Sequence, residues 1–101
     1  MADLGVVARF IATKQFDKAF ARLPARQKDK VRQVLTDALT DIHAPLLHLH
    51  QLTADWDGAY SLNVGGDLRI LFDAVDEQDP DGQTITVGVL IIVGTHAQLY
   101  G

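Results

Sequence analysis

The stretch Thr84-Ile-Thr-Val-Gly-Val-Leu-Ile-Ile-Val93 is the most apolar run of this chain, and it decides the fold. It carries no charge and is rich in β-branched residues, which favour strands. Its ten residues are too few to cross a bilayer as a helix. The run therefore predicts a central strand that is buried on both faces and on which the other elements pack.

The chain ends with Gly94-Thr-His-Ala-Gln-Leu-Tyr-Gly101, which follows the apolar run directly. His96 therefore stands at the end of a rigid strand. Because an imidazole takes up and releases protons near neutral pH, His96 is a candidate catalytic acid or base.

Length and composition predict one domain that spans residues 1–101. The 101 residues, with 48% hydrophobic content, suit a single core. The sequence has no cysteine, which excludes disulfides and thiolate catalysis and is compatible with a reducing cytoplasm. Met1–Gly5 has no basic start and no sustained apolar stretch follows it, so we expect a cytoplasmic protein without a signal peptide or a membrane partner.

Charge is distributed unevenly along the chain. Residues 1–40 hold eight of the nine Lys and Arg residues and four Asp, a balance of +4. Residues 41–101 hold only Arg69 against nine acidic residues, a balance of −8. The first part could therefore face a polyanion, whereas the second part alone would repel one.

The first part predicts a strand followed by two helices. Residues 6–11 form a short apolar run typical of a strand, and Thr13 can cap the helix that follows. Pro24 ends this helix and opens a second one. Apolar residues recur at helical spacing in both, which predicts that the helices pack on one face of a sheet. The basic residues on their solvated side are Arg22, Arg26, Lys28, Lys30 and Arg32.

A hairpin is predicted around Gly65-Gly66, because residues 59–64 and 67–72 alternate apolar and polar on either side of this turn signal. Its polar face holds Ser61, Asn63, Asp67 and Arg69. The expected fold class is therefore α+β, with an antiparallel sheet of about four strands, two N-terminal helices packed on one face and an open polar face on the other.

The segment between the helices and the hairpin is rich in histidine. Pro45 prevents a helix at its start, and His48 and His50 would share a side if the segment is extended. With Asp41 and His43 these residues could suggest zinc, but a fourth ligand at a recognised spacing is missing, so we predict no metal. The sequence Trp56-Asp-Gly58 is typical of a turn, with the indole buried.

Several short motifs follow one another along the chain. They are a Leu-Pro between two helices, His50-x-Leu52, Trp56-x-Gly58, a Gly-Gly hairpin before Asp67-x-Arg69-Ile-Leu-Phe72, and the terminal Gly94-Thr-His-Ala-Gln-Leu-Tyr100. Together they resemble the RelE/ParE toxin superfamily. Each motif is common by itself, whereas the set in this order is specific. The resemblance is to the YafQ branch of the superfamily, and it covers nearly the whole chain.

The resemblance implies a RelE-like fold and the toxin of a type II toxin–antitoxin system, a ribosome-dependent endoribonuclease that cuts mRNA. Such an enzyme needs no metal and no cofactor, because a ribose 2′-hydroxyl attacks the neighbouring phosphate. The reaction needs a base for the hydroxyl, stabilisation of the charged phosphorane and an acid for the departing 5′-oxygen. The implied partners are the ribosome, mRNA and a cognate antitoxin protein.

The positions that match the family motifs are the candidate site residues. His50 and His96 are the candidate acid and base, in an order that the sequence leaves open. Arg69 offers a planar fork for phosphate oxygens. Asp67 would orient a neighbouring imidazole, and Tyr100 would stack on a base or donate a hydrogen bond. Further polar residues that could hydrogen-bond RNA are Ser61 and Asn63.

Two positions depart from the YafQ pattern, which has a histidine at the position of Asn63 and an acidic residue at that of Ser61. Asparagine cannot transfer a proton at neutral pH, so proton transfer would rest on His50 and His96. The acidic second part of the chain is another departure, because RNA affinity rests on Lys and Arg. Contact with ribosomal RNA would therefore depend on the helical part.

Other functions and purely structural roles stay open. A ParE-like inhibitor of DNA gyrase would use the same scaffold without either histidine, and a catalytically weakened relative would act as a binding protein. The two histidines could be partly buried rings, Arg69 the partner of an acidic neighbour, Asp67 a turn residue and Tyr100 a core residue. An antitoxin is expected in every case, with apolar contacts or contacts to the basic helical residues.

Overall fold

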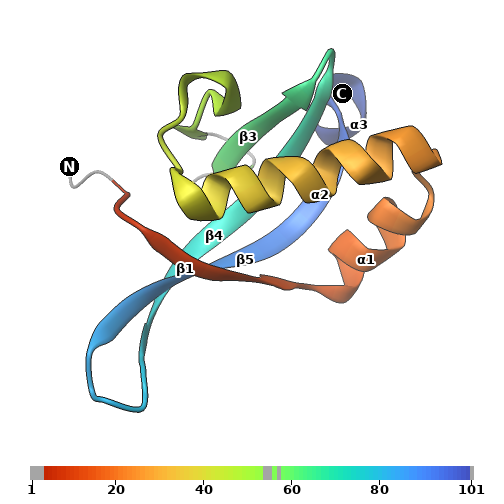
Figure 1. Ribbon diagram of the computed structural model, residues 1–101. Helices are drawn as coiled ribbons and strands as arrows, with labels where there is room; N and C mark the ends of the chain where they lie inside the picture. Colours follow the sequence, from red (N-terminus) through yellow and green to blue (C-terminus); the bar gives the residue numbers. More distant parts are fainter. Residues whose placement is uncertain (1–3, 54–55, 57, 101) are drawn as a thin grey trace.

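The computed structural model describes residues 4–53, 56 and 58–100, and its framework is one five-stranded sheet with two long helices against it (Figure 1). In chain order the elements are β1 (Val7–Ala12), α1 (Lys14–Ala21), α2 (Ala25–Thr40), the short 3-10 helix η1 (Pro45–Leu47), β2 (His50–Gln51), β3 (Tyr60–Gly65), β4 (Leu68–Gln78), β5 (Thr84–Thr95) and α3 (His96–Tyr100).

The strands lie in the order β1-β5-β4-β3-β2. β1 runs parallel to β5, and the other neighbouring pairs are antiparallel. The expected α+β class is confirmed, but the sheet is mixed and has five strands instead of about four antiparallel ones. β2 has two residues, too few for a periodic pattern, and no local pattern states in which direction a distant partner strand runs.

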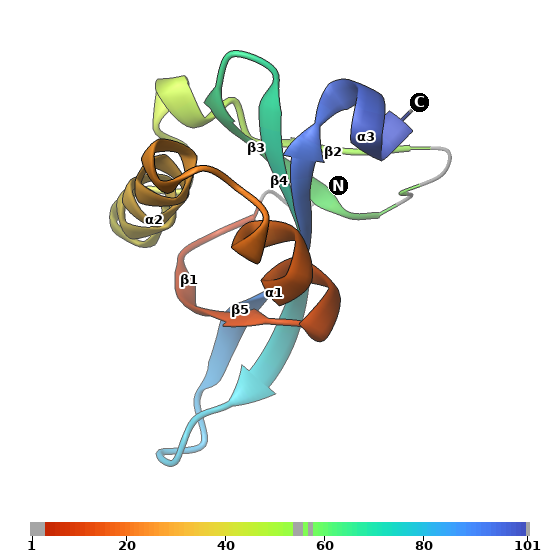
Figure 2. The ribbon, with the colours of Figure 1, turned by 90° about the vertical axis from the view of Figure 1, so that its right-hand side faces the viewer.

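β5 is the central strand that the apolar run predicts, because it lies between β1 and β4. Leu90 and Val93 are buried in the core beneath the helices. The expected burial on both faces holds only in part, since Val87 is fully buried whereas Ile91 and Ile92 are half-buried. The reason is visible in Figure 2, where α1 and α2 lie on the same side of the sheet and leave most of the other side uncovered.

The two N-terminal helices begin where the sequence predicts. The Thr13 hydroxyl caps α1 by accepting a hydrogen bond from the backbone N–H of Phe16 at 3.1 Å, and Pro24 is the N-cap of α2. Buried Phe16 and Val31 anchor the two helices in the core. None of the helices in the described ranges is both long and apolar enough to cross a membrane.

β4 and β5 continue as a hairpin beyond the rest of the molecule (Figure 1). β4 pairs with β3 only as far as Phe72, whereas its pairing with β5 continues to Gln78. Past Phe72 the hairpin carries Asp73, Asp76, Glu77, Asp79 and Asp81; Asp73 and Asp76 still lie level with β1, and Glu77 pairs with Arg9 of β1 at 2.7 Å. Much of the negative charge of the second half of the chain therefore lies on this hairpin.

Candidate functional site

A cavity of about 330 Å³ brings together side chains from β2, β3, β4 and α3. We call it the histidine cavity, and its lining residues are His50, Leu52, Ser61, Arg69, His96 and Tyr100. Five of these six residues are site candidates from the sequence. Within the described part of the chain, no carboxylate lines the cavity. Its ionisable groups are thus two imidazoles, a guanidinium and a phenol.

Strand pairing places four polar side chains on one face of the sheet. His50 lies opposite Ser61 in the β2–β3 pair, and Asn63 lies opposite Arg69 in the β3–β4 pair. Residues directly opposite each other on paired strands project to the same face of the sheet. Ser61 and Asn63 also share a face, because they are two positions apart on one strand. The register of three strands therefore assembles this side of the site.

α3 contributes two more of the candidate side chains. His96 and Tyr100 are four residues apart, so they share a helix face, and their ring centroids are 4.6 Å apart. The helix is absent from the fold expected from the sequence. Its signal is present, however, because Thr95-x-x-Gln98 matches the capping box that begins many helices.

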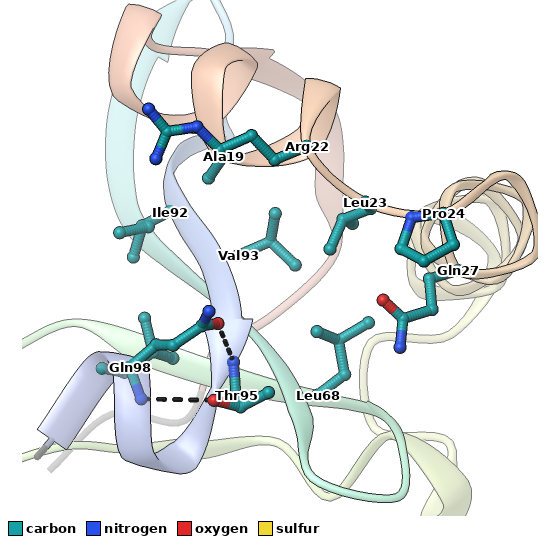
Figure 3. Close-up of a pocket in the computed structure, with 11 residues that line it drawn as sticks. Ala19, Arg22, Leu23, Pro24, Gln27, Leu68, Ile92, Val93, Thr95 and Gln98 are labelled. Atoms are coloured by element: carbon teal, nitrogen blue, oxygen red, sulfur yellow. Dashed lines mark hydrogen bonds between the residues drawn. The ribbon is translucent and has the colours of Figure 1, made fainter.

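α3 is held at both of its ends. The backbone N–H of His96 donates to the Asp67 carbonyl at 3.1 Å. Figure 3 shows the reciprocal cap, in which the N–H of Thr95 donates to Gln98 Oε1 at 2.8 Å and the N–H of Gln98 donates to Thr95 Oγ1 at 3.2 Å. At the last turn, Trp56 Nε1 donates to the Leu99 carbonyl at 2.9 Å. These bonds fix the position of the His96 ring relative to the sheet.

The hydrogen bond of His50 determines which of its ring nitrogens can accept a proton. Its Nδ1 lies 2.9 Å from the carbonyl oxygen of His48. A carbonyl oxygen only accepts hydrogen bonds, so Nδ1 must carry a proton. In the neutral ring the lone pair is then on Nε2. His50 is exposed and lines the cavity, so Nε2 is the candidate proton acceptor.

Arg69 is anchored through only one of its terminal nitrogens. Nη1 donates to Asn63 Oδ1 at 2.8 Å and to the carbonyls of Gly66 and Leu68, each at 3.1 Å. Within the described residues, Nη2 and Nε have no recorded partner. Among the described residues, Arg69 forms no ion pair with an acidic neighbour. Its Nη2 and Nε groups can therefore donate hydrogen bonds to a bound anion.

Ser61 supplies a buried hydroxyl that lacks a partner. Its exposed fraction is 0%, and its Oγ has no hydrogen-bond partner among the described residues. A buried polar atom without a partner costs free energy, about 1–3 kcal/mol, so such atoms often mark functional positions. Ser61 belongs to the wall of the histidine cavity, but its hydroxyl is closed to solvent, so a bound ligand would reach it only if neighbouring side chains moved.

Two candidate residues lie outside the lining of the cavity. The Asn63 side chain contacts Arg69 and acts as its anchor. Asp67 is exposed, and its recorded contact with His96 is made by its backbone carbonyl. Sequence reasoning missed Leu52 as a lining residue. Trp56 was expected to be buried, but it is half-buried and holds α3, while Asp57 of the expected turn lies outside the described residues.

A larger groove of about 440 Å³ lies on the other side of α3 (Figure 3). It is lined by residues of α1, the α1–α2 turn, α2, β4, β5 and α3: Ala19, Arg22, Leu23, Pro24, Gln27, Leu68, Ile92, Val93, Thr95, Gln98 and Leu99. We call it the apolar groove. Arg22 is its single ionisable lining residue in the described ranges, so it lacks the groups for acid–base chemistry.

The histidine-rich segment does not form the zinc site that its composition could suggest. In the described residues, no three His, Asp or Glu side chains are placed to hold a metal ion. His43 Nε2 instead contacts the carbonyl of Leu4.

Comparisons with known proteins identify the fold. No family model matches the chain, and no curated protein matches it by sequence. Among solved structures, it resembles YafQ from E. coli BL21(DE3) with a TM-score of 0.71 and 20% identity, over 91% of this chain and 97% of that one.

Two further solved structures give a similar result. The toxin–antitoxin complex RelBE2 from Mycobacterium tuberculosis matches with a TM-score of 0.63 and 21% identity, over 90% of this chain and 100% of that one. A YoeB/ParE toxin from Agrobacterium tumefaciens matches with a TM-score of 0.66 and 16% identity, over 87% of this chain and 98% of that one. The RelE-like fold expected from the sequence is therefore confirmed.

Proposed function

We propose that this chain is the toxin of a type II toxin–antitoxin system and that it cuts mRNA on the ribosome without a metal ion. The observation that carries the proposal is the histidine cavity, which combines His50, Arg69 and His96 with no carboxylate in its described lining. Such a set can move two protons and stabilise a negatively charged phosphorane. The fold shared with YafQ, RelBE2 and YoeB/ParE structures supports the toxin role.

In the proposed reaction, Nε2 of His50 removes the proton from a ribose 2′-hydroxyl. The 2′-oxygen attacks the adjacent phosphorus, and Arg69 stabilises the charge that develops on the phosphoryl oxygens. His96, in its protonated form, gives a proton to the 5′-oxygen as the phosphorus–oxygen bond breaks. The products are a 2′,3′-cyclic phosphate and a 5′-hydroxyl end, and the two histidines exchange their protonation states.

The remaining cavity residues have binding roles in this proposal. The Tyr100 ring, which packs beside His96, can stack on a nucleobase. The buried Ser61 hydroxyl would donate to a phosphate oxygen, and gain its missing hydrogen bond, only if the cavity wall moved when RNA binds. Asn63 keeps the Arg69 guanidinium in place, and Asp67 contributes through its contact with the His96 backbone.

The proposed macromolecular partners are assigned to two adjoining surfaces that share Arg22. Ribosomal RNA would contact the basic side of α1 and α2, where Arg22, Arg26, Lys28, Lys30 and Arg32 lie. A cognate antitoxin would place an apolar segment with acidic flanks in the apolar groove, because the lining is mainly aliphatic and its rim carries Arg22. All of these interactions would take place in the cytoplasm.

The test is brief induction of the parent protein and of His96→Ala in bacterial cells, followed by primer extension on abundant mRNAs. The parent should arrest growth and produce cuts phased with codons, and His96→Ala should reduce cutting at least about 100-fold, because it removes the general acid. Lys14→Ala, an exposed change on α1, is the control and should cut as the parent does.

The other functions give different results in the same experiment. Growth arrest with intact mRNA and inhibited DNA gyrase would indicate a ParE-like inhibitor. Normal growth and intact mRNA would indicate a binding protein without catalysis. Full cutting by His96→Ala would contradict the proposed chemistry.

A further inference from the structure

We propose that His48 is a positioning residue for His50. The left-handed backbone of His48 directs its carbonyl oxygen to the His50 ring, where it accepts a hydrogen bond from Nδ1–H. This bond keeps the proton on Nδ1 and leaves Nε2 as the proton acceptor. The catalytic consequence rests on the proposed function. The structural part, which nitrogen carries the proton, can be tested without any activity.

The backbone of His48 has an uncommon conformation. Its φ of 45° and ψ of 48° are left-handed, and among the described residues it is the only non-glycine with a positive φ. Residues with a side chain rarely adopt this region, and such strain persists where the surrounding structure requires it. His48 ends η1, where its N–H donates to the Pro45 carbonyl at 3.3 Å.

The left-handed turn places the His48 carbonyl beside the ring of His50. The two atoms, His48 O and His50 Nδ1, are 2.9 Å apart. Two residues after His48 the chain enters β2, where the backbone of His50 pairs with Ser61. The imidazole is therefore held from two directions, by the strand pairing that carries its Cα and by the carbonyl that binds Nδ1.

This geometry selects one neutral form of the imidazole. Without a partner at Nδ1, a histidine ring populates both neutral tautomers, and only the one with a lone pair on Nε2 can accept a proton there. The backbone of His48, rather than its side chain, provides the selection, since the His48 side chain is exposed and has no hydrogen bond recorded in the described residues. Position 48 should therefore tolerate any residue that accepts the left-handed conformation.

The experiment compares substitutions that keep or oppose this conformation. Glycine and asparagine adopt it readily, whereas a β-branched residue does not. We therefore compare His48→Gly and His48→Asn with His48→Val. Leu46→Val is the matched control, because Leu46 is an exposed residue of η1, two positions before His48, has no positive φ and also becomes β-branched.

The first measurement is the nitrogen-15 NMR spectrum of the His50 ring in its neutral form. We expect protonated Nδ1 and unprotonated Nε2 in the parent, His48→Gly, His48→Asn and Leu46→Val, and averaged signals in His48→Val. The second measurement is RNA cleavage, which should fall about tenfold or more in His48→Val and less than about twofold in the other variants. Thermal unfolding verifies that all the variants are folded.

Several results would overturn the proposal. They are a parent ring with the proton on Nε2, a His48→Val ring whose signals match those of the parent, or an equal loss of cleavage in His48→Gly and His48→Val. If the parent does not cleave RNA at all, the proposed function fails, and the NMR result still decides whether the His48 carbonyl fixes the ring.

Discussion

At the scale of residues, the site combines few ionisable groups with neutral residues that hold them. Asn63 and Ser61 stand where the YafQ pattern has ionisable side chains, and neither can transfer a proton at neutral pH. The structure gives Asn63 another use, since its oxygen accepts a hydrogen bond from Arg69 at 2.8 Å. The proposed chemistry therefore needs only His50, His96 and Arg69 as charged or proton-transferring groups.

The guanidinium of Arg69 gives the first prediction at this scale. Arg69→Lys keeps the positive charge but loses the planar fork, so we expect cleavage to fall about 100-fold, as when a donor to a transition-state oxyanion is removed. Asn63→Ala removes one of three anchors and leaves the fork intact, so it should cost about tenfold or less.

The measurement is the single-turnover rate of mRNA cleavage on programmed ribosomes for the parent and both variants. An Arg69→Lys protein as fast as the parent would show that the planar fork has no part in the reaction. A larger loss for Asn63→Ala than for Arg69→Lys would show that Asn63 itself contacts the RNA.

The sequence indicated candidate side chains but not the contacts that they make. Alternation in the hairpin placed Ser61, Asn63 and Arg69 on one face, and strand pairing reproduces this arrangement. No pattern could indicate that the His48 carbonyl binds the His50 ring, because that contact depends on a single left-handed residue. Asp67 looked like a partner for an imidazole through its carboxylate, but its recorded contact is made by the backbone.

At the scale of elements, α3 separates the histidine cavity from the apolar groove. His96 and Tyr100 line the first, whereas Gln98 and Leu99 line the second. A five-residue helix has too few bonds of its own to be stable, so its position depends on the cap at Thr95 and on Trp56. Helices α1 and α2 had strong periodic patterns and were predictable, whereas α3 and β2 are too short to produce one.

The helices α1 and α2 lead to a prediction for the antitoxin. Arg22→Glu should weaken the toxin–antitoxin complex about tenfold at low salt, and the difference from the parent should shrink as salt screens the charge. Lys14→Glu makes the same change of charge near the start of α1, away from the groove-lining residues, and should have little effect. The measurement is a salt titration of the dissociation constant by calorimetry.

This placement of the antitoxin would be wrong under either of two results. One is an affinity of Arg22→Glu equal to that of the parent at every salt concentration. The other is an equal loss for Lys14→Glu, which would show that the complex responds to the overall charge and not to the groove.

At the scale of the whole molecule, charge and chemistry are separated in space. Most basic residues lie on α1, on α2 or between them, and five acidic residues lie on the β4–β5 hairpin past Phe72, outside the lining of the histidine cavity, where Glu77 pairs with Arg9 of β1. The net charge of −4 therefore does not describe the surface near the site. The sequence showed this separation only as two parts of opposite charge. How far the β4–β5 hairpin extends past β3 depends on where β4 stops pairing with β3, and the sequence does not show that point.

The most direct test of the central claim is to identify the chemical ends of mRNA cut by this protein on purified ribosomes. Attack by the 2′-hydroxyl, with His50 and His96 as base and acid, predicts a 2′,3′-cyclic phosphate, or the 3′-phosphate formed from it, on the upstream fragment and a 5′-hydroxyl on the downstream fragment. A 3′-hydroxyl with a 5′-phosphate, or mRNA that stays intact with active protein, would contradict the account.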